Sequence, residues 1–194
     1  MDEALVAEIV AADAELKGPS PDAWFDRLDG NQAALEEALA WSLEHDLEQS
    51  LRLAGAVWPY WLARGHVDSG RAWLAKVLAA TEWGDRTAPR AKALYGAGSL
   101  AFKQGDREPS LRFHTESLAI ARELGDQGLE ADALIGLGRV AELDRDGIMM
   151  EQNAQRSLEA ARAAADPQRV GAALNLVEEA KRIQARDEEP SPPA

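Results

Sequence analysis

One segment of the sequence recurs with a period of about 40 residues, and this periodicity restricts the fold more than any other feature. The strings LYGAGSLA and LIGLGRVA are two versions of the segment, and Leu94, Leu134 and Leu174 are evenly spaced at this period. The same offset relates Gly65 to Gly105. Repeats of about 20–50 residues are typical of proteins in which one supersecondary unit stacks on the next. The chain is therefore predicted to form a stacked array.

Each unit is predicted to contain two helices joined by a turn. Leu134, Leu137, Gly138 and Ala141 follow the i, i+3, i+4, i+7 spacing of one helix face. Strong helix formers dominate the composition, and no stretch alternates with period two. The predicted fold class is all-α, a right-handed superhelix of antiparallel helix pairs with about nine to ten helices. The predicted helices span 2–16, 21–29, 31–45, 47–64, 67–81, 87–104, 107–124, 127–143, 148–164 and 167–186.

Turn chemistry supports these boundaries. Gly105 can take the left-handed conformation that ends a helix, and Asp106 and Asp146 stand where a carboxylate can cap the next one. Pro109 falls in a first helical turn, where proline is tolerated. Pro59 lies inside a predicted helix, so we expect a kink or a late start there.

The repeats divide the chain into one predicted domain, residues 1–186, followed by a tail. The tail, 187–194, contains DEEPSPPA and is predicted to be disordered because it is charged and proline-rich. Within the domain we expect N-terminal capping helices at 1–46, repeats at 47–84, 87–125 and 127–165, and a C-terminal helix at 167–186.

Composition narrows the classes of partner. The net charge is −13 and the pI about 4.7, so the chain repels phosphate backbones and anionic lipid surfaces. We expect no direct nucleic-acid or membrane binding. The absence of cysteine excludes thiolate metal sites and disulfides. The N-terminus carries acids where a signal peptide needs bases, so a cytoplasmic location is expected.

The segment from Leu94 to Leu118 resembles a tetratricopeptide repeat. Gly98 stands at the small first-helix position, Gly105 in the turn, and Ser117 and Leu118 late in the second helix. The usual repeat has about 34 residues. The longer period resembles the helical-repeat segment of large bacterial signalling ATPases and transcription regulators, of the LuxR-type maltose-regulator-like and actinobacterial antibiotic-regulator kinds.

The likeness continues upstream and covers about residues 21–180. The matching residues are Trp24, Leu28, Asp29, Asn31, Ala40, Trp41, the Arg64-Gly65-His66 turn and the string Gly70, Arg71, Trp73 and Leu74. Those proteins also carry an ATPase module and a DNA-binding domain. This sequence has no GxxxxGK[ST] loop and no basic recognition helix, so neither activity is carried over. The resemblance implies a docking or sensing segment.

Three other patterns have a structural and a functional interpretation. The GxG pairs Gly96–Gly98 and Gly136–Gly138 could belong to a dinucleotide loop, but they lie inside predicted helices, which favours packing. His45, His66 and His114 fall at a helix end, a turn and a packing position, so no shared metal site is expected. The tryptophans Trp58, Trp61 and Trp73 either line a ligand pocket or fill the core, which is the favoured interpretation.

The first helices of stacked pairs should line a concave face, and the repeat register assigns residues to it. Basic members of this set, in a very acidic chain, suggest a groove for a peptide carboxylate or an acidic segment. An ordinary mixed solvated surface is an equal alternative. Besides Pro59, Leu62, Ile135 and Glu179, the predicted partner-binding residues are Arg52, Lys92, Tyr95, Ser99, Lys103, Asp132, Arg139, Glu142 and Asn175.

These patterns favour a non-catalytic protein–protein interaction scaffold with a regulatory role, without cofactor or metal. The alternative is a small-molecule-sensing domain of a transcriptional regulator, with a ligand near Tyr60, Trp61 and Tyr95. An enzyme is not expected. Terminal repeats without a polar outer face would favour self-association into a homo-oligomer.

Overall fold

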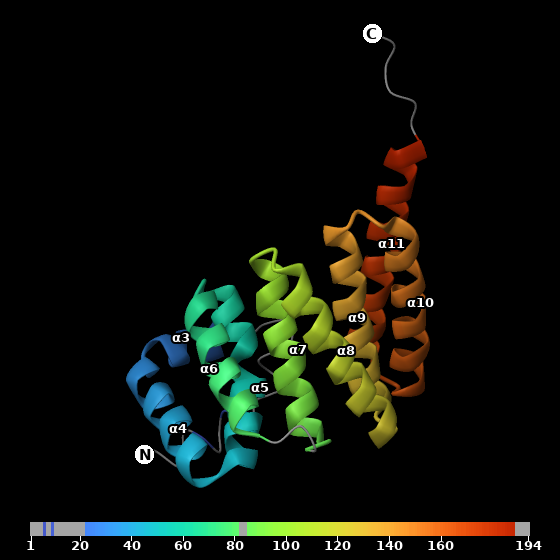
Figure 1. Ribbon diagram of the computed structural model, residues 1–194. Helices are drawn as coiled ribbons and strands as arrows, with labels where there is room; N and C mark the ends of the chain where they lie inside the picture. The colour runs from blue at the N-terminus through green and yellow to red at the C-terminus, as the bar shows by residue number, and fades with distance from the viewer. Residues whose placement is uncertain (1–5, 7–8, 10–21, 82–84, 189–194) are drawn as a thin grey trace.

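A computed structural model describes Val6, Ile9 and residues 22–81 and 85–188, and this part of the chain contains nine α-helices and no strand. Successive helices lie side by side in chain order, from α3 and α4 at one end to α10 and α11 at the other (Figure 1). The predicted all-α class is confirmed. The helices are α3 (Asp22–Asp29), α4 (Gln32–His45), α5 (Leu47–Ala63), α6 (Val67–Ala80), α7 (Ala88–Lys103), α8 (Arg107–Leu124), α9 (Gln127–Leu143), α10 (Gly147–Ala163) and α11 (Pro167–Glu188).

The predicted helix boundaries agree with the observed ones to within one residue, with one exception. Helix α11 ends at Glu188, two residues beyond its predicted end. The predicted helix 2–16, apart from Val6 and Ile9, and residues 189–194 lie outside the described residues. Helix α5 begins at Leu47 with Pro59 inside it, so the late start considered for this helix is wrong.

Aspartate side chains cap the N-termini of four of the helices. The Oδ1 atoms of Asp46, Asp126, Asp146 and Asp166 each accept the backbone N–H three residues ahead, at 2.9–3.0 Å. The predicted cap at Asp146 is confirmed. The predicted cap at Asp106 is wrong, because its carboxylate pairs with Arg71 of the preceding helix pair and makes no cap bond.

Glycines let the helices approach one another closely. A Cβ atom on Gly96 would lie 2.7 Å from Cγ of Trp58, and one on Gly138 would lie 2.6 Å from Cδ2 of Leu176. Both distances are too short for carbon atoms, so a larger residue would force the facing side chain or its helix to shift. The GxG pairs are therefore packing features inside α7 and α9, as the sequence favoured.

Two buried serines make the same contact in successive repeats. Ser117 Oγ donates to the Ala91 carbonyl at 2.9 Å, and Ser157 Oγ donates to the Ala131 carbonyl at 2.9 Å. Each bond joins the second helix of a pair to its first. The largest apolar cluster extends from α3 to α9 along this row of helices. No helix in the described part of the chain is long and apolar enough to cross a membrane.

The interhelical turns also recur at the repeat spacing, but with different residues. Gly65, Gly105 and Arg145 have φ of 77°, 75° and 55°, and Gly125 and Ala165 have φ of 67° and 53°. A side chain in this left-handed region costs about 1–2 kcal/mol, which glycine avoids at a smaller entropic cost. Arg145 and Ala165 are thus strained where the equivalent turns use glycine.

We expect Arg145→Gly and Ala165→Gly each to raise the free energy of unfolding by about 0.5–1 kcal/mol, since each relieves a left-handed side chain. Chemical denaturation of the two variants and the parent measures this. The matched control is Gly125→Ala, which introduces the same strain and should destabilise by a similar amount. Destabilisation by both glycine variants would contradict the argument.

Candidate functional site

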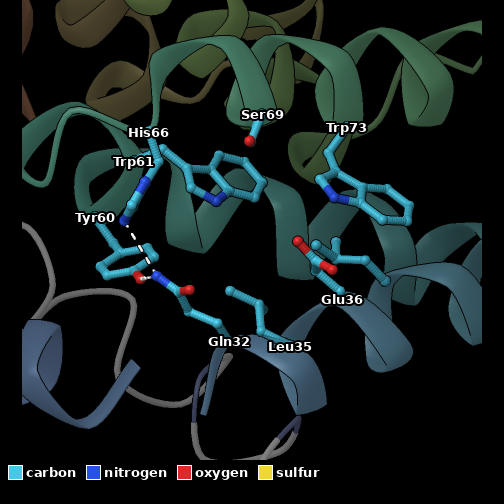
Figure 2. A pocket seen from close by; sticks show the side chains of 9 residues that line it. Gln32, Leu35, Glu36, Tyr60, Trp61, His66, Ser69 and Trp73 are labelled. Carbon is cyan, nitrogen blue, oxygen red and sulfur yellow. Dashed lines mark hydrogen bonds between the residues drawn. The ribbon is translucent and has the colours of Figure 1, made fainter. Parts of the chain in front are cut away.

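Two cavities lie on either side of α5. The first is enclosed by α4, α5, the following turn and α6, and Figure 2 shows its walls. Tyr60 and Trp61, predicted as a ligand pocket, line this cavity, with 1% and 3% of their surfaces exposed. Both also belong to the main apolar cluster.

Hydrogen bonds join three of the polar side chains that line this first cavity, Gln32, Tyr60 and His66. Gln32 Nε2 donates to Tyr60 Oη at 3.0 Å and lies 3.1 Å from His66 Nε2 (Figure 2). Tyr60 Oη in turn donates to Asp29 Oδ1 at 3.0 Å. The cavity measures about 60 Å³, whereas small-molecule sites need about 300 Å³ or more. It can hold water but not a metabolite-sized ligand.

The second cavity, here called the α5–α9 pocket, measures about 340 Å³ and is large enough for a small molecule. Four helices supply its walls. The lining residues are Trp58 and Leu62 of α5, Tyr95, Ser99, Phe102 and Lys103 of α7, His114 of α8, and Ile135, Gly136 and Arg139 of α9.

Aromatic rings in the α5–α9 pocket contact one another in sequence. Trp58 meets Tyr95 edge-on at 5.4 Å between centroids and 88° between planes, and Tyr95 meets His114 at 5.4 Å and 54°. These are the tilted arrangements that aromatic quadrupoles favour. Burial raises the pKa of the Tyr95 hydroxyl well above its usual value, so the ring stays neutral.

His114 occupies a slot between two glycines. A Cβ on Gly98 would lie 2.6 Å from its Cε1 atom, and one on Gly136 would lie 2.5 Å from its Cγ atom. The side chain is 1% exposed, and burial lowers its pKa to about 3, so the imidazole is neutral at pH 7. Neither ring nitrogen has a hydrogen-bond partner among the described residues.

Trp58 also carries a buried polar atom without a hydrogen-bond partner. Its Nε1 atom is buried and has no hydrogen-bond partner in the described part of the chain. Buried polar groups in native proteins are nearly always paired, so each exception needs an explanation. Here three such atoms, one on Trp58 and two on His114, belong to two residues that line the same pocket.

The structure brings together six of the residues predicted for the concave face. The α5–α9 pocket is lined by Leu62, Tyr95, Ser99, Lys103, Ile135 and Arg139 of that set. Arg139 is not free, because its Nη1 atom donates to Glu142 at 2.9 Å and to Glu179 at 2.6 Å. Glu142 therefore lies beside the pocket as the partner of a lining residue.

The remaining predicted residues lie elsewhere. Arg52 is exposed and pairs with Glu48 on its own helix, and Asp132 accepts a bond from Arg169 at 2.8 Å. Lys92 is half-buried on α7 and Asn175 is exposed on α11, and neither lines a cavity described above. The predicted row of basic residues is thus partly neutralised by carboxylates at Arg52 and Arg139.

Sequence reasoning gave His114 a packing role and missed Phe102 and Gly136. His114 is indeed buried, but its unpaired nitrogens distinguish it from an ordinary core residue. One sequence signal could have indicated this. His114 aligns with Leu74 and Ala154 in the neighbouring units, so a polar side chain replaces apolar ones at a buried register position.

The described residues contain no group of three His, Asp or Glu side chains placed to hold a metal ion. No protein-family model matches the chain, and no curated protein matches its sequence significantly.

Because the folded-state pKa of His114 is depressed, its effect on stability has a definite sign. Between pH 6.5 and about 3 the unfolded chain binds a proton that the folded chain excludes, so stability falls as the pH drops through this window. The slope from this group reaches roughly 1.4 kcal/mol per pH unit. We expect His114→Phe, which keeps a flat ring in the slot, to remove this contribution.

Urea denaturation of the parent and His114→Phe between about pH 7 and pH 4 measures the difference. The variant should gain stability relative to the parent as the pH falls. His45→Gln, at an exposed helix end, is the control for loss of a histidine. A constant difference across the range would show that His114 is not buried in a neutral form.

Proposed function

We propose that the chain is a non-catalytic binding scaffold, a tetratricopeptide-like solenoid with a right-handed superhelical course. Three observations support this. Helices follow one another side by side, equivalent buried serine bonds recur in successive repeats, and positive-φ turns recur at the same spacing. Stacked helix pairs of this kind present extended surfaces for partners.

The partner site proposed here is the face formed by α5, α7 and α9, and the proposed partner is a peptide or protein. The observation that carries this is the composition of the α5–α9 pocket, whose walls come mainly from the first helices of three successive pairs. A pocket shared between units can anchor one large side chain of a partner while neighbouring turns contact the rest. Lys103, exposed at this pocket, favours an acidic or carboxylate-bearing segment.

A regulatory role in the cytoplasm fits the resemblance to helical-repeat segments of bacterial signalling ATPases and transcription regulators. In such proteins the repeats dock or sense, while other domains hydrolyse nucleotide and bind DNA. The net charge of −13 argues against direct contact with nucleic acid or anionic membranes. Self-association into a homo-oligomer would require terminal repeats without a polar outer face.

Small-molecule sensing is the second candidate, and the volume of the α5–α9 pocket favours it. About 340 Å³ lies within the range of small-ligand sites, and the walls combine aromatic rings with a few polar groups. The site for a ligand then lies at Tyr95, not at the small cavity beside Tyr60 and Trp61.

Peptides selected from a random display library on the parent protein test the scaffold proposal. We expect their affinity to fall at least about tenfold for Ser99→Trp, which places a large ring in the pocket, and for the combined alanine variant of Lys92, Lys103 and Arg139. Arg156→Trp is the matched control, because Arg156 is exposed on α10 and lines neither cavity.

Titration calorimetry gives the affinities, and thermal unfolding checks that each variant is folded. Peptides that bind all variants equally would place the partner site elsewhere. Failure to select any peptide would remove the proposal of a peptide-binding scaffold and leave small-molecule sensing as the favoured candidate.

A further inference from the structure

Two side chains that line the α5–α9 pocket, His114 and Trp58, carry buried hydrogen-bonding groups without a partner among the described residues, and these groups indicate what a ligand would have to offer. A neutral imidazole has one N–H donor and one nitrogen acceptor, and an indole has one N–H donor. His114 and Trp58 thus present two donors and one acceptor, none of them bonded within the described residues. A ligand hydroxyl both accepts and donates, so it suits this combination better than a group that only accepts.

The positive charge of the pocket wall favours a negatively charged group on the ligand. Two cations, Lys103 and Arg139, line the pocket, and no aspartate or glutamate does. The described residues give Arg139 two carboxylate partners but give Lys103 no ion pair. Lys103 is exposed whereas His114 is buried, so the uncompensated positive charge stands at the outer part of the pocket.

The shape and chemistry of the walls select the ligand body. Trp58, Tyr95, His114 and Phe102 surround the space with aromatic rings, and Ile135 and Leu62 add aliphatic surface. Flat rings pack against such walls by offset or edge-on contacts, which contribute roughly 0.5–1.5 kcal/mol beyond area burial.

We propose that the α5–α9 pocket binds a small aromatic carboxylic acid that carries a ring hydroxyl, with the hydroxyl at His114 and Trp58 and the carboxylate toward Lys103. A free hydroxyaryl acid and a peptide ending in tyrosine share this chemistry. The first source needs no peptide partner, so this inference does not depend on the scaffold proposal. The neutral state of His114 at pH 7 keeps its acceptor nitrogen available for the hydroxyl proton.

Three matched compounds test the assignment. The probe is 3-(4-hydroxyphenyl)propanoate, 3-phenylpropanoate lacks only the hydroxyl, and 3-(4-hydroxyphenyl)propanamide lacks only the charge. We expect the probe to bind with a Kd of about 1 mM or tighter. Loss of the hydroxyl should weaken binding about tenfold, and loss of the charge about threefold to fivefold.

Variants assign each loss to its residue. In Lys103→Gln the acid and the amide should bind alike, while Lys181→Gln, which removes an exposed lysine of α11 that lines neither cavity, should keep the difference. In His114→Phe the preference for the hydroxyl should disappear. Binding should also shift the indole N–H resonance of Trp58, identified by its loss in Trp58→Phe.

A fourth probe, N-acetyl-Gly-Gly-Tyr, separates the two sources. Tighter binding of this peptide than of the free acid would assign the pocket to a peptide end, and the reverse would assign it to a small molecule. The proposal is overturned if none of the probes binds at about 10 mM. It is equally overturned if the hydroxyl and charge preferences are absent, or survive in folded His114→Phe and Lys103→Gln.

Discussion

The close approach of the helices at glycine is the constraint on which the rest of this structure depends. Where α7 and α9 carry Gly98 and Gly136, the imidazole of His114 fits between them, and a Cβ added to either glycine would lie 2.6 Å or less from a ring atom. Gly96 accommodates Trp58 in the same way. The glycines therefore do more than let the helices approach closely. They leave room for the indole of Trp58 from α5 and the imidazole of His114 from α8, and both rings contact Tyr95 in the α5–α9 pocket.

Most of the fold was predictable because its signals are local or periodic. Helix ends follow from aspartates and glycines within a few residues, and the repeat register carries one assignment into the next unit. The failure at Asp106 shows the limit of such signals. Its sequence position suits a cap, but Arg71, in the preceding helix pair, takes the carboxylate in a contact between pairs. Arg90, only 4% exposed and bonded to Glu116 at 2.9 Å, is a second long-range contact that no local pattern indicates.

The site was predictable only in part, for a geometric reason. Residues at equivalent register share a face, so Tyr95, Ser99, Lys103 and Arg139 were placed together correctly. Residues two apart in sequence are separated by about 200° around a helix, so Trp58 and Tyr60 point to opposite sides of α5 and line different cavities. Tyr60 and Tyr95 accordingly line different cavities. The pairing of Arg139 with Glu179, one full repeat away, likewise depends on how closely α9 and α11 approach.

The polar atoms buried in this array fall into two kinds, and the contrast bears on function. Ser117 and Ser157 each donate to a backbone carbonyl of the paired helix, so their burial is compensated and serves the packing. His114 lies one turn before Ser117 on α8, yet its nitrogens are uncompensated within the described residues, at a cost of about 1–3 kcal/mol per group. Leu74 and Ala154 show that apolar side chains serve at the equivalent positions. Stability alone does not account for a histidine here, since total stabilities are only about 5–15 kcal/mol. His114 lowers stability and lines a ligand-sized pocket, so its presence is most simply explained by a ligand that binds there.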